Sequence, residues 1–149
     1  MNNYNGILMV NKPSGITSRD VVNIVGKTLN TKKVGHTGTL DPMATGVLVL
    51  CLGNALKVCE LITANDKEYI AKVILGIETE TLDTTSPIIN TKKTNITKEE
   101  IEKVLNSFKG SYLQEVPKYS AVKINGKKLY EYAREGKEIE LPKKMVTIY

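Results

Sequence analysis

The chain has 149 residues, 41% hydrophobic and 25% charged, which suits one globular domain and excludes wholesale disorder. Its longest apolar run, 47–52, is too short to cross a bilayer, and its start lacks the pattern of a secretory signal. Two cysteines and one histidine cannot build a disulfide framework and argue against a metal site. We therefore expect a soluble, cytoplasmic protein that holds no metal.

Charge is distributed unevenly along the chain, whose net charge is +5. Residues 1–59 contain six basic and two acidic side chains, residues 60–117 seven and ten, and residues 118–149 eight and four. Two basic segments that flank an acidic one indicate a positive surface suited to nucleic acid. Lysine that serves solubility alone would give the same numbers, so charge leaves both explanations open.

The first third of the chain predicts two strands and a helix around a long loop. A short strand is expected over 6–10, and Thr17 with Asp20 has the spacing of a capping box for the following helix. Residues 30–43 lack periodicity and predict a loop. The apolar run 47–52 predicts a central strand that is buried on both faces.

The rest of the chain predicts three strands and two helices in irregular order. Thr97 and Glu100 form a second capping box, and Asn125-Gly126 is a strong hairpin-turn signal. Strands and helices that mix without regular alternation indicate an α+β class. The expected elements are a strand over 69–77, a helix after Thr97, a strand over 119–124, a helix over 128–135 and a strand from 145 onward.

The segment 34–46, VGHTGTLDPMATG, is the candidate site. Its three glycines permit unusual backbone angles and the close approach of a ligand. It is not a phosphate-binding P-loop, because no Gly-Lys-Ser/Thr follows. Asp41 is the sole carboxylate of the segment, and it either does chemistry or forms an Asx-turn before the proline. His36 is either functional or an ordinary hydrogen-bonded loop residue.

Two stretches, NKPSGITSRDVV and KVGHTGTLDPMATGVLVLCLGNALK, closely resemble the TruB family, the bacterial tRNA pseudouridine-55 synthases. DKEYIAKVILGIETETLD, the residues Gln-Glu-Val-Pro at 114–117 and YSAVKINGKKLYEYAREGKE also fit the family, in order and with natural spacing. The resemblance covers nearly all of the chain. It implies an α+β fold with a mixed, largely antiparallel central sheet and flanking helices, the catalytic-domain fold of pseudouridine synthases in truncated form.

The same resemblance implies the reaction. The family isomerises one uridine in the T-loop of tRNA, without a cofactor, and Asp41 matches its catalytic aspartate. A carboxylate can act as a nucleophile and split a difficult step into two easier ones. Attack on the base ring and attack on the sugar, with a transient glycal, both stay open.

Further roles follow from the same match. Tyr69 matches the tyrosine that stacks on the target base, although an ordinary aromatic on a strand face would read the same. His36 matches a histidine that fills the space left by flipped-out bases. The supporting residues, which buttress the catalytic loop or allow close approach, are Lys12, Pro13, Gly35 and Gly38.

Three lysines, Lys123, Lys127 and Lys128, lie where the family clasps RNA. Phosphate contact is the expected role and plain solvation the alternative. The implied partner is the T-arm of tRNA, and neither a membrane nor a protein partner is implied.

Two departures from the family pattern stand out. Val116-Pro117 replaces two prolines, which alters only the stiffness of a turn. The Gly-Thr-Tyr-Ile-Arg segment, whose arginine pairs with the aspartate, does not occur. Residues 1–149 thus read as the N-terminal portion of the catalytic domain, without its remainder and without the C-terminal RNA-binding domain, and are expected to be inactive or weakly active. A non-catalytic RNA-binding module and an unrelated ribosome-associated protein are the competing hypotheses.

Overall fold

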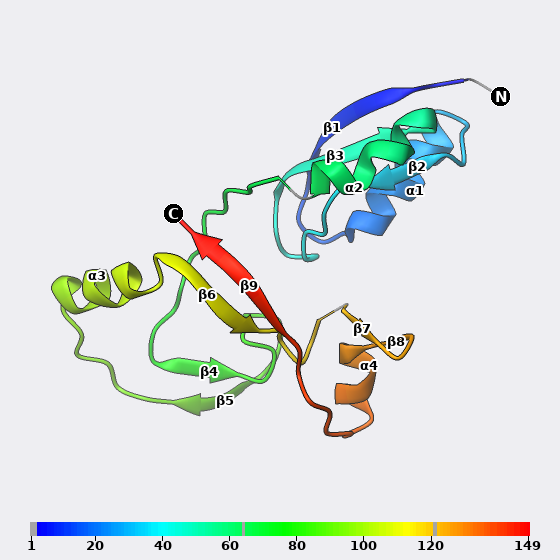
Figure 1. Ribbon diagram of the computed structural model, residues 1–149. Coiled ribbons are helices and arrows are strands. Elements are labelled where there is room, and N and C mark those ends of the chain that lie inside the picture. The colour runs from blue at the N-terminus through cyan, green and yellow to red at the C-terminus, as the bar shows by residue number, and fades with distance from the viewer. Residues whose placement is uncertain (1–2, 64, 121) are drawn as a thin grey trace. The chain divides into compact units, whose positions relative to one another are not determined.

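The structure is a computed structural model that describes residues 3–63, 65–120 and 122–149 (Figure 1). The chain divides into two compact units, residues 1–72 and residues 73–149. Within the described residues, no helix combines the length and the apolar character that a membrane crossing requires.

The first unit is built on a three-stranded antiparallel sheet in the order β1-β3-β2. The strands are β1 (Gly6–Lys12), β2 (Val34–His36) and β3 (Gly46–Leu52). β3 lies between the other two, with Lys12 opposite Gly46 on one side and His36 opposite Leu50 on the other. The expected central strand is therefore confirmed. The expected loop over 30–43 is partly wrong, because its residues 34–36 pair with β3 as β2.

Helix α1 (Ser18–Thr28) packs against this sheet and forms the core of the unit. The Thr17 side chain accepts a hydrogen bond from the backbone N–H of Asp20, and the Asp20 carboxylate accepts one from the N–H of Thr17, so the expected capping box is present. Val21 and Val22 meet two buried leucines of β3 in the core. Burying each such side chain contributes about 1.5–3 kcal/mol, and this holds α1 on the sheet.

A short 3₁₀ helix, η1 (Gly53–Val58), and α2 (Cys59–Thr63) follow β3. The Asn5 side chain accepts a hydrogen bond from the backbone N–H of Asn54 at 2.8 Å and so fixes the start of η1. A Cβ on Gly35 would lie 2.7 Å from Cδ2 of Leu56, so the glycine leaves room for η1 to approach the sheet. β3 is not buried along its whole length, because Val47 is 67% exposed.

The second unit contains short antiparallel pairs and two helices. β4 (Ile77–Thr79) pairs with β5 (Ile88–Thr91), and β6 (Gly110–Glu115) pairs with β9 (Lys143–Ile148). Helix α3 (Lys98–Ser107) leads into β6 (Figure 1) and begins with the expected capping box of Thr97 and Glu100. All strand pairs of the described residues are antiparallel, in agreement with the expected α+β class.

A hairpin and a short helix complete this unit. β7 (Lys123–Ile124) and β8 (Lys127–Lys128) are joined by Asn125 and Gly126, whose φ angles of 51° and 81° are those of a tight type I′ turn. Helix α4 (Leu129–Arg134) follows β8, within a residue of the expected helix. The turn and the helix are therefore confirmed. Of the expected strand over 119–124, residue 121 lies outside the described residues, and only 123–124 form strand.

The expected strand over 69–77 is wrong for most of its length. Residues 66–74 form neither helix nor strand, and regular structure resumes only with β4. Ile70 is 99% exposed, and within the described residues this stretch has no partner strand. A β-prone sequence does not form a strand without a neighbour that takes its backbone hydrogen bonds.

Candidate active-site loop

The loop between β2 and β3, residues 37–45, is tied to the rest of the first unit at its start and near its middle. The backbone N–H of Thr37 donates to Val49 O at 3.0 Å, and Thr37 is buried. Near the middle of the loop, the N–H of Gly15 donates to Pro42 O at 2.8 Å. Gly15 has φ of 91°, a conformation that other residues resist, which explains a glycine in this turn.

Lys12 links the loop to the turn that follows β1. Its side chain is fully buried at the end of β1, and its Nζ donates to Pro13 O at 2.9 Å, Ile16 O at 2.8 Å and Pro42 O at 3.2 Å. Three carbonyls satisfy all three N–H groups of the ammonium. The turn that begins at Pro13 and the loop are therefore bound to the same cation.

Ser18 holds the other side of the loop. Its side chain is 2% exposed, and its Oγ accepts from Leu40 N at 2.9 Å and donates to Leu40 O at 3.1 Å. The side chain of Leu40 packs against the core of α1 and β3. Backbone and side chain of the residue before Asp41 are thus both fixed.

Asp41 stands exposed between these two anchors. Its backbone oxygen accepts from Ala44 N at 3.0 Å, which closes a turn. None of the hydrogen bonds or ion pairs of the described residues involves its carboxylate, so the Asx-turn that the sequence left open is absent. The result is a free carboxylate on a fixed backbone.

His36 lies on β2, not in a loop. Its Nδ1 is buried and has no hydrogen-bond partner within the described residues, while its backbone oxygen accepts from Cys59 Sγ at 3.3 Å. Of the three glycines that permit unusual backbone angles, Gly46 uses one, with φ of 133°, whereas Gly35 and Gly38 lie outside the left-handed region. A Cβ on Gly38 would meet no atom within 4 Å, so the fold itself does not require that glycine.

Tyr69 is not fixed beside this loop. It is 67% exposed, in the stretch without helix or strand that follows α2. Among the described residues, its hydroxyl has no hydrogen-bond partner. The structure thus leaves the tyrosine accessible and gives it no structural role of its own.

The three lysines of the expected RNA clasp differ in their surroundings. Lys123 is exposed, whereas Lys127 binds the carboxylate of Glu135 and Lys128 donates to the hydroxyl of Tyr130 at 3.2 Å. The Lys127 hydrogen bond is the main cause that lowers the pKa of Glu135. Lys127 therefore has a partner at the C-terminal end of α4 and Lys128 one within α4, and both are half-buried, whereas Lys123 is exposed.

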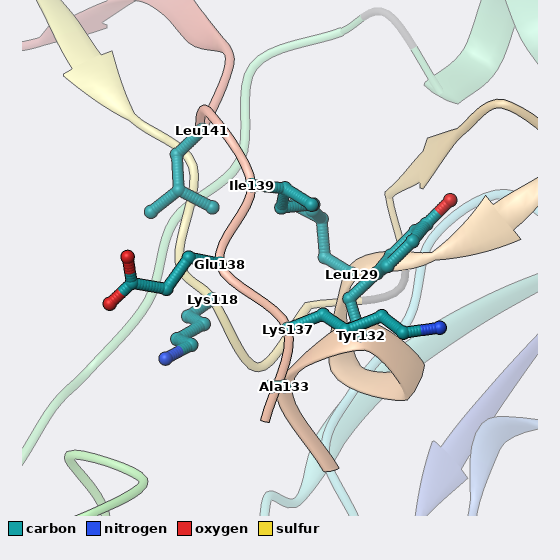
Figure 2. A pocket seen from close by; sticks show the side chains of 8 residues that line it. All are labelled: Lys118, Leu129, Tyr132, Ala133, Lys137, Glu138, Ile139 and Leu141. Atoms are coloured by element: carbon teal, nitrogen blue, oxygen red, sulfur yellow. The ribbon is translucent and has the colours of Figure 1, made fainter. Parts of the chain in front are cut away.

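The second unit also holds a pocket of about 250 Å³ beside α4 (Figure 2). Leu129, Tyr132 and Ala133 of α4 form one side, and the segment 137–141 forms much of the rest. None of the candidate site residues lines it.

Sequence reasoning missed two residues that hold the loop, Gly15 and Ser18. A signal for Ser18 exists in the tandem Thr17-Ser18, because a capping box needs only the first hydroxyl. The partner of the second hydroxyl, Leu40, lies 22 residues away and has no local signature.

Comparisons with known proteins identify the family of the chain. Residues 26–149 match the family described as "TruB family pseudouridylate synthase (N terminal domain)". The chain is 55% identical over 146 residues to "tRNA pseudouridine synthase B" of Bacillus subtilis, covering 97% of this chain and 47% of the relative. A protein of the same name from Alkaliphilus oremlandii is 52% identical over 145 residues, covering 97% and 48%. The chain thus spans about half the length of these curated relatives.

Two solved structures share the fold. A chain of a Cbf5–Nop10–Gar1 complex superimposes with a TM-score of 0.54 at 28% identity, covering 79% of this chain and 31% of that one. A chain of an H/ACA RNP bound to a substrate RNA containing 2′-deoxyuridine gives 0.51 at 25% identity, covering 81% and 34%. Sequence and fold agree, and the chain belongs to the TruB family of pseudouridylate synthases, whose N-terminal domain it matches.

Proposed function

We propose that this chain carries the nucleophile of a tRNA pseudouridine(55) synthase, and that Asp41 is that nucleophile. The observation that carries the proposal is the free, exposed carboxylate of Asp41 on a backbone that Ser18, Lys12 and Gly15 fix on both sides. A nucleophile needs an unencumbered lone pair and a defined position, and this arrangement supplies both.

The proposed reaction is an isomerisation that needs no cofactor. The bond between N1 of uracil and C1′ of ribose breaks, the base turns, and a bond forms between C5 and C1′. The C5 proton leaves and N1 gains a proton, so atoms and electrons balance without a cofactor. Asp41 would form the covalent intermediate, either with the base ring or with the sugar, and both routes stay open.

Tyr69 and His36 suit the handling of a flipped-out base. The exposed ring of Tyr69 offers a stacking surface, and stacking of this kind is worth about 1–3 kcal/mol per base. Its hydroxyl is free to assist removal of the C5 proton. The imidazole of His36, with its unpartnered Nδ1, is proposed to fill space that bases leave in the T-loop.

Among the lysines of the hairpin, we assign the phosphate contact to Lys123, because it is exposed whereas the other two are half-buried. Lys127 and Lys128 are assigned to stabilising the hairpin and α4 through Glu135 and Tyr130. The implied substrate is the T-arm of tRNA and the implied compartment is the cytoplasm, in keeping with bacterial relatives named tRNA pseudouridine synthase B.

The test uses two forms of the protein, because the chain spans about half the length of its relatives. One form is residues 1–149, and the other is the chain continued to the relatives' length, called the full-length form below. Each is incubated with an unmodified tRNA transcript, and pseudouridine is mapped along the RNA. We expect conversion at position 55 by the full-length form and little or none by residues 1–149, which lack the family's arginine.

A transcript with cytidine at position 55 is the matched control and should stay unmodified. Tight binding by the full-length form without any pseudouridine would favour the non-catalytic RNA-binding module. Conversion by residues 1–149 at the full-length rate would show that the remainder of the catalytic domain is dispensable.

A further inference from the structure

The Ser18 hydroxyl hydrogen-bonds to the candidate loop and not to its own helix. It is the first residue of α1, directly after the N-cap position at which small hydroxyl residues usually serve the helix end. Here Thr17 caps the helix, while Ser18 Oγ binds both the N–H and the carbonyl of Leu40. With an exposure of 2%, this hydroxyl is not available to solvent or to RNA.

The two contacts immobilise the peptide that precedes Asp41. A hydroxyl carries one donor and two acceptor lone pairs, so it can satisfy both polar groups of one extended residue. On the other side of Asp41, the carbonyl of Pro42 accepts from Lys12 Nζ and Gly15 N. The aspartate therefore lies between two hydrogen-bonded neighbours, the backbone of Leu40 and the carbonyl of Pro42.

We propose that Ser18 is a positioning residue for the carboxylate of Asp41, acting through the backbone of Leu40. The inference rests on the proposed function, because it assigns Ser18 to the geometry of that reaction. Without the hydroxyl, the Leu40 N–H and carbonyl lose a partner in a partly buried place, and the loop shifts to reach water. A displacement of about 1 Å at a reacting group can cost about 100-fold in rate.

Thr17 supplies a matched control. Thr17→Ala removes a hydroxyl from the neighbouring position and weakens the same helix end, but Thr17 bonds with Asp20 and makes no hydrogen bond to the loop. Ser18→Ala removes the contacts to Leu40 and leaves the cap in place. Any effect that comes merely from a less stable α1 should appear in both variants.

The experiment measures kcat and KM of pseudouridine formation for the full-length form and both variants. We expect Ser18→Ala to lower kcat by about 10- to 100-fold while KM stays within about threefold, because binding surfaces are untouched. Thr17→Ala should keep kcat within about twofold. A Ser18→Ala kcat within twofold of the parent, or an equal loss in both variants, would overturn the proposal.

A second measurement does not depend on activity. Amide hydrogen exchange is followed at Leu40, whose N–H bonds to Ser18, and at Leu50 in the core of β3. Ser18→Ala should speed exchange at Leu40 by about tenfold or more and leave Leu50 slow, whereas Thr17→Ala should not change Leu40. Unchanged exchange at Leu40 overturns the proposal. If the parent makes no pseudouridine, the proposed function fails, and exchange alone decides whether Ser18 fixes the loop.

Discussion

The buried ammonium of Lys12 makes a quantitative test of how the loop is held. Lys12→Met keeps most of the apolar stem and removes the donor to the carbonyls of Pro13, Ile16 and Pro42. Pro42 O keeps its hydrogen bond from Gly15 N, so the carbonyls of Pro13 and Ile16 are the two that are left without a donor. Each buried acceptor left unpaired costs about 1–3 kcal/mol.

An opposing effect reduces this cost. Burying an ammonium is itself unfavourable, and the methionine does not carry that penalty. The two unpaired acceptors together cost about 2–6 kcal/mol and the relieved penalty offsets part of this, so we expect the free energy of opening of the first unit to fall by about 1–4 kcal/mol. Pseudouridine formation should fall as well, because the loop of Asp41 loses one of its anchors.

The assay is native-state hydrogen exchange of the full-length form at the amides of Leu48 and Leu50, which are buried in β3. Lys27→Met is the matched control, since Lys27 lies exposed in the last turn of α1 and should cost at most about 1 kcal/mol. A loss for Lys12→Met below about 0.5 kcal/mol, or one equal to that of Lys27→Met, would refute the reasoning that the ammonium cross-links turn and loop.

Two further predictions concern charged side chains. Lys123→Gln should reduce the slope of log tRNA affinity against log salt concentration by about 0.7. Lys127→Gln should leave this slope unchanged and destabilise α4, because Glu135 loses its ion pair. Filter-binding titrations at several salt concentrations distinguish the two variants. The hydrogen bond from the Thr17 hydroxyl lowers the pKa of Asp20 in the folded state. The ionised carboxylate therefore stabilises α1 fully at pH values above its ordinary pKa of 3.8, and this stabilisation is lost as the pH falls through the lower pKa of the folded state. Opening free energies of α1 from hydrogen exchange should therefore fall on acidification, and less steeply in Thr17→Ala; equal slopes would contradict the assignment.

Features that depend on neighbouring residues could be predicted from the sequence. The capping box of Thr17 and Asp20 spans three residues, and the turn at Asn125-Gly126 spans two, so each carries its own signal. The candidate loop could be located for a similar reason, because its glycines, His36 and Asp41 are adjacent in the chain.

Features that depend on distant partners could not be predicted. The stretch 66–74 has the composition of a strand, but the described residues offer it no neighbouring strand. Ser18 and Leu40 are 22 residues apart in the chain, and no local sequence pattern predicts their contact. Likewise, the sequence shows that Lys127 lies near Lys123 and Lys128 in the chain, but it does not show that Lys127 forms an ion pair with Glu135.

The central claim is that the carboxylate of Asp41 does the chemistry. Asp41→Asn in the full-length form keeps the size of the side chain and removes the nucleophile, and Asp66→Asn, at another exposed aspartate of the first unit, is the matched control. Single-turnover conversion of unmodified tRNA should fall below about 1 per cent of the parent for Asp41→Asn, with tRNA affinity within about threefold, and stay near the parent level for Asp66→Asn. Conversion by Asp41→Asn above that level would contradict the account and assign the attack to another group.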